Sequence, residues 1–279
     1  MITLATMVAD RPWGMQANLL SLMSQTYDGP LIYNIYDNGD VPCYKDEIVV
    51  KYLEMLTCYR KNFEVNIKVV EKQPVDFIRQ QALDECKSSR ILYVDSDVYM
   101  NPFIVDVVRH LIFKHEAGYI QPCIQDANAL GYQNGDPEII SNPETVDDYN
   151  RPYKIYNDYF ELYPHYWMDS ACVCFDAEIL RSVGGFKDWA EKFGTMIGSD
   201  VWVARKMKLN NTPGILINDY AWHNILQGSR YYTEFKIKRD LIDNGLEHLI
   251  HDIKMAVDFR EIINSAIARG EFDYLYEKN

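Results

Sequence analysis

The chain has 279 residues, of which 48% are hydrophobic, so it is long and apolar enough to bury a sizeable core. Its formal net charge of -13 disfavours a broad, non-specific grip on nucleic acid or on an anionic membrane, since both need a basic surface. No apolar run approaches the length of a membrane span. The composition predicts a globular protein of one large α/β domain or two small ones.

The amino terminus and the cysteines predict a cytoplasmic protein. Residues 1–8 carry neither a basic leader nor a small-residue cleavage site, and they are apolar enough to form a first strand. The six cysteines show no C-x-x-C pair, which is typical of reduced thiols. Cys172 and Cys174 share one face of a predicted strand, where core packing is favoured over a redox or metal role.

Strands and helices alternate through the first half of the sequence. Apolar runs with period two predict strands, and apolar residues at helical spacing predict helices. The predicted strands are residues 1–8, 31–36, 63–70, 91–94 and 119–124. One predicted helix follows the breaker at residues 10–12, and three others cover residues 45–61, 75–86 and 103–115. This alternation implies right-handed βαβ crossovers, and hence an α/β fold with a mainly parallel central sheet flanked by helices.

The second half is less regular. Residues 125–152 have no periodicity and are rich in Asn, Asp, Gly and Pro, which favours a binding loop or lid. An aromatic stretch leads from there to Trp167. Later segments predict strands at 170–175 and 214–217, helices from 177 and over 198–209, and mostly helix from 231 to about 269.

Two aspartates end the strand at residues 91–94. Asp95 and Asp97 are two positions apart, so in an extended segment both carboxylates project to the same side. In an open α/β sheet this end of the strand faces the ligand crevice. Two such acids repel each other, and a divalent cation that also binds phosphate relieves the repulsion. The alternative is that both aspartates cap the helix beginning near Pro102.

Further motifs accompany this pair. They are Ser-Leu-Met-Ser-Gln-Thr at 21–26, Arg79-Gln80 sixteen residues before Asp95, Val-Gly-Gly-Phe at 183–186, Gly-Ser-Asp-Val-Trp at 198–202 with Arg205, and Trp222-His223. In order and spacing they resemble the family 2 type glycosyltransferases of the GT-A fold, whose metal motif corresponds to Asp95-Ser96-Asp97. The resemblance covers roughly residues 1 to 230.

The resemblance implies a domain organisation and a reaction. Residues 1–229 would form the GT-A domain, with a nucleotide-sugar-binding half at 1–124 and an acceptor and catalytic half at 125–229. Residues 230–279 would form a C-terminal helical extension. The implied reaction is inverting transfer of a sugar, most often from a UDP-linked donor, to an acceptor hydroxyl.

The resemblance also implies a metal site for Mn²⁺ or Mg²⁺. Asp97 would be the direct ligand, and Asp95 would hold the ribose or a metal-bound water, with Ser96 between them in the donor site. His223 would be the third protein contact to the metal. Outside such a motif set, a lone histidine is an ordinary packed or surface side chain.

Other donor-site residues follow from the same resemblance. Asp37, at the end of the second strand, would accept a hydrogen bond from the nucleobase, and Asp10 or Arg11 would lie at the same edge of the sheet. Ordinary loop polarity is the alternative for each. Arg79 would contact the base or the phosphates, or would pair with Asp95. Ser229 and Arg230 would close over the diphosphate, the alternative being a solvated basic helix face.

Asp200 is the expected catalytic base, because inverting transfer needs one group to take the proton of the acceptor hydroxyl. It opens a predicted helix, where the dipole favours a carboxylate, so it is also suited to a purely capping role. The family's preceding Glu is Ser199 here. Trp167 and Asp169 are the candidates for acceptor binding, because aromatic faces pack well on sugar rings.

Two other functions fit parts of the pattern. A nucleotidyltransferase shares the sheet topology and the acidic metal site, but it would carry a glycine-rich phosphate loop where this chain has residues 9–12, Ala-Asp-Arg-Pro. The other is a non-catalytic binding protein that keeps the GT-A fold. The acceptor stays open among a glycan, a lipid, a protein, a small molecule and a hydroxylated DNA base.

Overall fold

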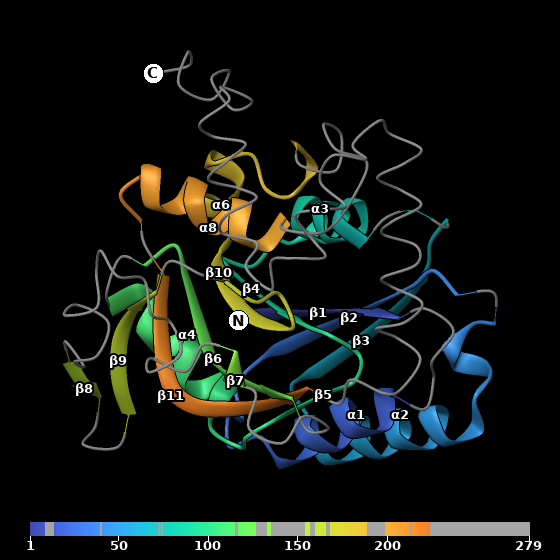
Figure 1. Cartoon of the computed structure of the whole chain (residues 1–279). Helices are drawn as coiled ribbons and strands as arrows, with labels where there is room; N and C mark the ends of the chain where they lie inside the picture. Colours follow the sequence, from blue (N-terminus) through green and yellow to red (C-terminus); the bar gives the residue numbers. More distant parts are fainter. Residues whose placement is uncertain are drawn as a thin grey trace.

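One large mixed sheet organises the structure, a computed structural model (Figure 1). The structure describes residues 1–8, 14–39, 41–71, 73, 75–114, 117–126, 133–134, 154–156, 160–165, 168–188, 199–212 and 214–223. The strands are β1 (Ile2–Val8), β2 (Leu31–Asp37), β3 (Phe63–Val69), β4 (Arg90–Val94), β5 (Val98–Met100), β6 (Tyr119–Asp126), β7 (Gln133–Asn134), β8 (Lys154–Tyr156), β9 (Phe160–His165), β10 (Cys172–Asp176) and β11 (Gly214–His223).

The helices lie on both faces of this sheet. They are α1 (Met15–Ser24), the short 3₁₀ helix η1 (Cys43–Lys45), α2 (Glu47–Tyr59), α3 (Val75–Glu85), α4 (Ile104–Lys114), α6 (Ala177–Ser182) and α8 (Ser199–Leu209). In Figure 1, α3, α6 and α8 lie above the sheet, and α1 and α2 lie below it. The predicted α/β architecture with a helix-flanked sheet is confirmed.

Strand direction divides the sheet into two parts. The strand order is β3-β2-β1-β4-β10-β6-β11-β9-β8, and the first four strands are parallel. β10 runs antiparallel to both of its neighbours, β4 and β6, while β6 and β11 are parallel. The carboxyl ends of β1, β2 and β4 therefore meet at one edge, where the predicted donor-site residues follow them.

Two hydrophobic clusters hold the helices to the sheet. Alternate residues of β1 divide between them: Ile2 and Leu4 pack with α1, α2 and α4, whereas Ala5 and Met7 pack with α3, α6 and α8. This follows from the two-residue period of a strand that is buried on both faces. Each fully buried aliphatic side chain contributes about 1.5–3 kcal/mol, so the sheet is anchored from both sides.

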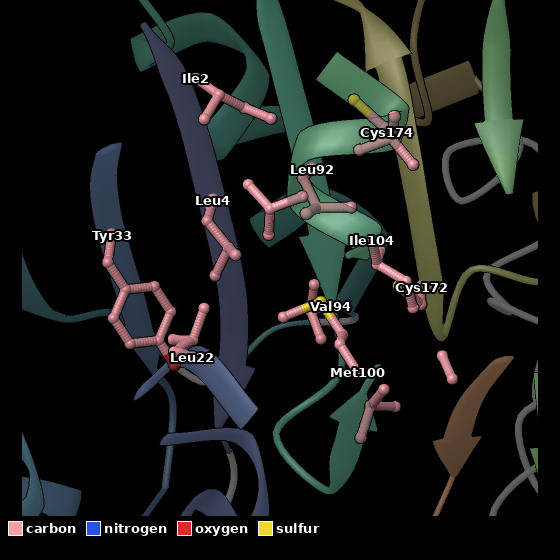
Figure 2. Packing of buried hydrophobic residues seen from close by; sticks show 14 of the residues in the cluster. Ile2, Leu4, Leu22, Tyr33, Leu92, Val94, Met100, Ile104, Cys172 and Cys174 are labelled. Carbon is pink, nitrogen blue, oxygen red and sulfur yellow. The ribbon is translucent and has the colours of Figure 1, made fainter. Parts of the chain in front are cut away.

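Cys172 and Cys174 belong to the first of these clusters. Figure 2 shows both on β10, among Leu92, Val94 and Ile104. Both are fully buried free thiols, and burial raises the pKa of each well above its ordinary value. A thiol that stays protonated is a poor nucleophile and metal ligand, so the core-packing interpretation holds for these two cysteines.

Several elements differ from the predictions. The short strands β5, β7, β8 and β9 were not expected, and β11 continues to His223 rather than ending at 217. β6 extends to Asp126, into the predicted loop. Most of the predicted loop at 125–152 and the whole extension at 230–279 lie outside the described residues. Within the described ranges, none of the helices combines the length and apolar character that crossing a bilayer requires.

His165, on β9, is a fully buried histidine. Its ring packs edge-on against Tyr119, with the centroids 5.8 Å apart, and neither ring nitrogen has a hydrogen-bond partner within the part of the chain that the structure describes. Burial lowers the pKa of His165 to about 3. The imidazole is therefore neutral in the folded protein at every pH near neutrality.

This burial predicts a loss of stability in mild acid. The unfolded chain binds a proton at His165 near pH 6.5 and the folded chain does not, so stability is present above that pH and falls as the pH drops towards 3. Between pH 7.5 and 5.5 the unfolding free energy should fall by about 1.4 kcal/mol more in the wild type than in His165→Phe, measured by urea denaturation. Asp76, whose pKa burial raises to about 6, acts in the opposite direction in both proteins and cancels in the comparison. Equal losses in the two proteins would contradict the prediction.

Candidate functional site

The acidic motif forms a tight turn between β4 and β5. The backbone N–H of Val98 donates to the carbonyl of Asp95 at 3.1 Å, and that of Asp95 donates to the carbonyl of Ala171 at 2.8 Å. The prediction that Asp95 and Asp97 lie on one extended segment is therefore wrong in detail. Both aspartates belong to a four-residue turn, residues 95–98, which follows the buried strand β4. The side chain of Asp95 is 30% exposed, so a ligand can reach its carboxylate.

The alternative role of these aspartates, capping the following helix, is excluded. β5 separates the turn from α4, which begins at Ile104. The cap comes instead from Gln25, the glutamine of the motif at 21–26, whose Oε1 accepts from the N–H of Val105 at 3.1 Å. Its Nε2 donates to the carbonyl of Asn101 at 2.8 Å. The motif thus fixes the junction of β5 and α4 behind the acidic turn.

Asn18, on α1, holds the acidic turn from below. It is fully buried, and its Nδ2 lies 3.3 Å from the carbonyl oxygen of Asp95 and 3.5 Å from that of Val98. Its Oδ1 accepts a hydrogen bond from the hydroxyl of Tyr33 at 2.9 Å. Sequence reasoning missed this residue, although an asparagine among the apolar residues of a helix face was a usable signal, because a buried amide needs partners.

β11 brings a further predicted residue to the turn. β5 pairs antiparallel with β11, and in this register His223 lies opposite Val98, the residue after Asp97 (Figure 1). The side chain of His223 lies outside the described part of the structure. An irregularity in β11 between Ile217 and Tyr220 contains Asp219, whose Oδ1 accepts from Asn101 Nδ2 at 2.7 Å. Asp219 is nearly buried and was not singled out from the sequence.

Arg79 connects the turn to α3. Its Nη2 lies 3.4 Å from Asp95 Oδ1 and its Nη1 lies 3.4 Å from Asp76 Oδ1, and the whole residue is only 5% exposed. Burial alone would lower the pKa of this guanidinium, but the surrounding carboxylates of Asp95, Asp76 and Asp200 raise it above its ordinary value. The structure thus contains the predicted pairing of Arg79 with Asp95.

The Val-Gly-Gly-Phe motif supports Arg79. The guanidinium lies over the ring of Phe186, 5.8 Å from its centroid. Gly185 has a φ of +62°, and a Cβ there would lie 2.2 Å from Oε1 of Gln80, which accepts from the N–H of Phe186 at 3.0 Å. Only glycine fits this turn without strain. Arg79 and Gln80 are thus both held by the same motif.

Asp76 links Arg79 to α8. Its carboxylate is fully buried, and the hydroxyl of Ser199 donates to Asp76 Oδ1 at 3.0 Å. Burial raises the pKa of Asp76 to about 6, with Arg79 and Ser199 opposing the shift. Asp200 follows Ser199 in the first turn of α8, where the helix dipole favours a carboxylate. The carboxylates of Asp95 and Asp200 therefore both interact electrostatically with the guanidinium of Arg79.

Asp37, the predicted base contact, ends β2 beside Val8 and is nearly fully buried. Its Oδ1 accepts from the N–H of Gly39 at 3.0 Å, and its Oδ2 accepts from the N–H of Cys43. These bonds fold the loop that follows β2. Each carboxylate oxygen can accept a second hydrogen bond, so the contacts are compatible with a ligand as well.

Asp169 lies beside the acidic turn. Its N–H donates to Oε1 of Gln121 at 2.8 Å, and its Oδ1 accepts from the N–H of Ala171 at 2.9 Å. Ala171 in turn accepts from the N–H of Asp95. The other predicted site residues, Asp10, Arg11, Trp167, Ser229 and Arg230, lie outside the described residues.

The acidic turn suits a divalent cation. Carboxylate oxygens are the ligands that Mg²⁺ and Mn²⁺ prefer, and the side chain of Asp95 is exposed enough for a cation to reach it. The described residues contain no group of three or more His, Cys, Asp or Glu side chains that would enclose a metal by themselves. The two aspartates therefore fit a site that a ligand from β11, or the substrate, completes.

Comparison with solved structures identifies the fold. TarS of S. aureus, residues 1–349 in complex with UDP-GlcNAc, superposes with a TM-score of 0.57 at 13% identity, covering 89% of this chain and 66% of that one. The mannosyltransferase PcManGT of Pyrobaculum calidifontis, in complex with GDP-Man and Mn²⁺, gives 0.57 at 12% identity, covering 91% and 64%. GalNAc-T7 with UDP, GalNAc and Mn²⁺ gives 0.58 at 11% identity, covering 86% and 48%.

These matches show that the chain has the GT-A fold of the nucleotide-sugar glycosyltransferases. The chain spans between about half and two thirds of the length of these structures. No family model matches the sequence, and no curated protein matches it. The likeness therefore lies in the three-dimensional arrangement.

The hydrogen bonds from Asn18 to the acidic turn, here called the Asn18 clamp, predict a stability difference between two variants. Asn18→Leu removes the bonds to the turn and also the hydrogen bond that Asn18 accepts from the Tyr33 hydroxyl, and it should lower the unfolding free energy by about 2–3 kcal/mol. Tyr33→Phe removes only the bond between the two side chains and should cost about 1 kcal/mol. Urea denaturation measures both values, and a smaller loss for Asn18→Leu than for Tyr33→Phe would refute the clamp.

Proposed function

We propose that the chain is a metal-dependent glycosyltransferase that moves a sugar from a nucleotide-diphosphate sugar to an acceptor hydroxyl, with inversion at the anomeric carbon. The expected donor is UDP-linked. Solved structures of similar fold are complexes with UDP, UDP-GlcNAc or GDP-Man, which supports a nucleotide-sugar donor. Because these complexes differ in nucleotide and sugar, the choice of UDP is part of the proposal.

One observation carries the proposal. Arg79 lies between the acidic turn and the start of α8, with Asp95 within 3.4 Å and Asp200 in its electrostatic environment. A pair of carboxylates able to hold a metal and a separate carboxylate able to act as a base are the two groups that inverting transfer needs. The GT-A fold supplies the frame in which these groups serve a nucleotide sugar.

The donor side of the site would be built from the acidic turn and β11. Asp97, Asp95 and His223 would hold Mn²⁺ or Mg²⁺, and the bound cation would stabilise the negative charge that develops on the departing diphosphate. Arg79 neutralises part of the charge of Asp95 and keeps its carboxylate oriented. Asp37 would accept a hydrogen bond from the base, and Asp10 and Arg11 would lie at the same edge.

Asp200 would act as the general base. It would take the proton of the acceptor hydroxyl as that oxygen forms a bond to the anomeric carbon. The bond from that carbon to the diphosphate breaks on the opposite side, and the diphosphate leaves with the electron pair. Trp167 and Asp169 would contact the acceptor, and Ser229 and Arg230 would cover the diphosphate.

Titration calorimetry tests the donor site. The purified chain is titrated with UDP, UDP-GlcNAc and GDP-mannose, each with Mn²⁺, with Mg²⁺ or with a chelator. We expect a nucleotide to bind with metal and not with chelator, and the bound nucleotide sugar to be slowly hydrolysed. Absence of binding to every nucleotide would indicate a non-catalytic protein that keeps the fold, as would binding without any turnover.

Two substitutions separate binding from chemistry. Asp97→Ala should abolish metal-dependent donor binding, because the direct metal ligand is lost. Asp200→Asn should leave the dissociation constant for UDP and Mn²⁺ within about threefold and reduce turnover by at least about 100-fold, because the amide cannot accept the proton. Calorimetry gives the first quantity, and release of sugar from the donor gives the second. Equal loss of donor affinity in both variants would refute this division of roles.

A further inference from the structure

The buried carboxylate of Asp76 has no role in the proposed reaction. It lies on α3, one turn before Arg79, and is fully buried. Its Oδ2 has no hydrogen-bond partner among the residues that the structure describes, and all of its described polar contacts use Oδ1. Burying a carboxylate costs free energy, so the position of Asp76 between Arg79 and Ser199 needs an explanation.

Those two contacts lead in opposite directions. Through Arg79, Asp76 is joined to the carboxylate of Asp95 on the acidic turn. Through the hydroxyl of Ser199 it is joined to the residue immediately before Asp200. One carboxylate therefore spans α3 and α8, with the candidate metal ligand at one end and the candidate base at the other.

The rest of α8 is anchored independently. The Nε1 of Trp202 donates to Asp188 Oδ2 at 3.1 Å. Nζ of Lys206 lies 2.8 Å from Asp188 Oδ1 and 2.7 Å from the carbonyl of Gly185. These contacts hold the middle of the helix to the turn at 183–188. The bond between Ser199 and Asp76 is a side-chain contact at the first residue of α8, and it joins this end of the helix to α3.

We propose that Asp76 is a positioning residue, which sets the place of Asp200 relative to Asp95 through the hydroxyl of Ser199 on one side and the guanidinium of Arg79 on the other. The inference rests on the proposed function for its consequence in catalysis. We call the contacts of Asp76 with Arg79 and with Ser199 the tie, and these contacts do not depend on the proposed function. Loss of the tie leaves the metal ligands intact and displaces the base, so it lowers turnover and spares donor affinity.

A matched pair of substitutions at Ser199 tests the tie. Ser199→Thr and Ser199→Val add nearly the same volume at a buried position, but only threonine keeps the hydroxyl that donates to Asp76. Ser199→Ala deletes the hydroxyl without adding volume, and it serves as a second variant if the valine protein does not fold. Thermal unfolding confirms that each variant protein folds.

Three quantities are compared in the wild type and the variants. They are the dissociation constant for UDP with Mn²⁺, the rate of sugar release from UDP-GlcNAc and from GDP-mannose with Mn²⁺, and hydrogen exchange in peptides from residues 199–209. Ser199→Thr should match the wild type in all three. Ser199→Val and Ser199→Ala should keep the dissociation constant within about threefold, lose about 10- to 100-fold in sugar release, and exchange faster in the first turn of α8.

The outcomes separate the tie from the function. Equal exchange and equal sugar release in the threonine and valine proteins would overturn the positioning role even if the wild type is active. Faster exchange in the valine protein with an unchanged rate would also overturn it, because the tie would then be structural only. If the wild type binds no nucleotide, the proposed function fails, and equal exchange in the pair would then overturn the tie as well.

Discussion

The buried guanidinium of Arg79 is the interaction on which the site depends. Removing this charge from water costs several kcal/mol, and the carboxylates of Asp76 and Asp95, each 3.4 Å away, compensate that cost. The ring of Phe186 and the hydrogen bond from Tyr93 to the carbonyl of Arg79 fix its place. Through its contact with Asp95, Arg79 joins α3, on which it lies, to the acidic turn. The arrangement that makes a metal site possible is therefore specified by charge as much as by hydrophobic packing.

The backbone of the acidic turn is also held by contacts with several parts of the chain. Asn18 of α1 contacts its carbonyls, Ala171 accepts its first N–H, and β5 continues from it into pairing with β11. The motif at 21–26 contributes through Gln25, which fixes the start of α4. Residues far apart in the sequence thus converge on four residues of chain. A ligand site that binds a metal and a diphosphate needs this preorganisation, since loose ligands lose affinity and rate.

Much of this arrangement could be predicted from sequence, where local pattern carries the information. The buried run before Asp95, the aspartate that ends β2 and the glycines at 184–185 each follow from period, burial or backbone requirement. The antiparallel direction of β10 was not predictable, because alternation specifies a strand and not its direction. Asn18 carried a usable signal as a polar residue on an apolar helix face, but the contacts of Asn18 with Asp95, of Asp76 with Ser199 and of Asp219 with Asn101 join residues 77, 123 and 118 positions apart. Such contacts become visible only when the chain is folded.

The central claim is that the acidic turn holds the metal of a nucleotide-sugar site. A crystal structure of the chain grown with UDP and Mn²⁺, with anomalous diffraction recorded near the manganese edge, tests it most directly. The account predicts one manganese peak within bonding distance of a carboxylate oxygen of Asp97 and of a diphosphate oxygen, beside the end of β11. Nucleotide bound at the sheet edge with no manganese at Asp97, or manganese bound elsewhere, would contradict it.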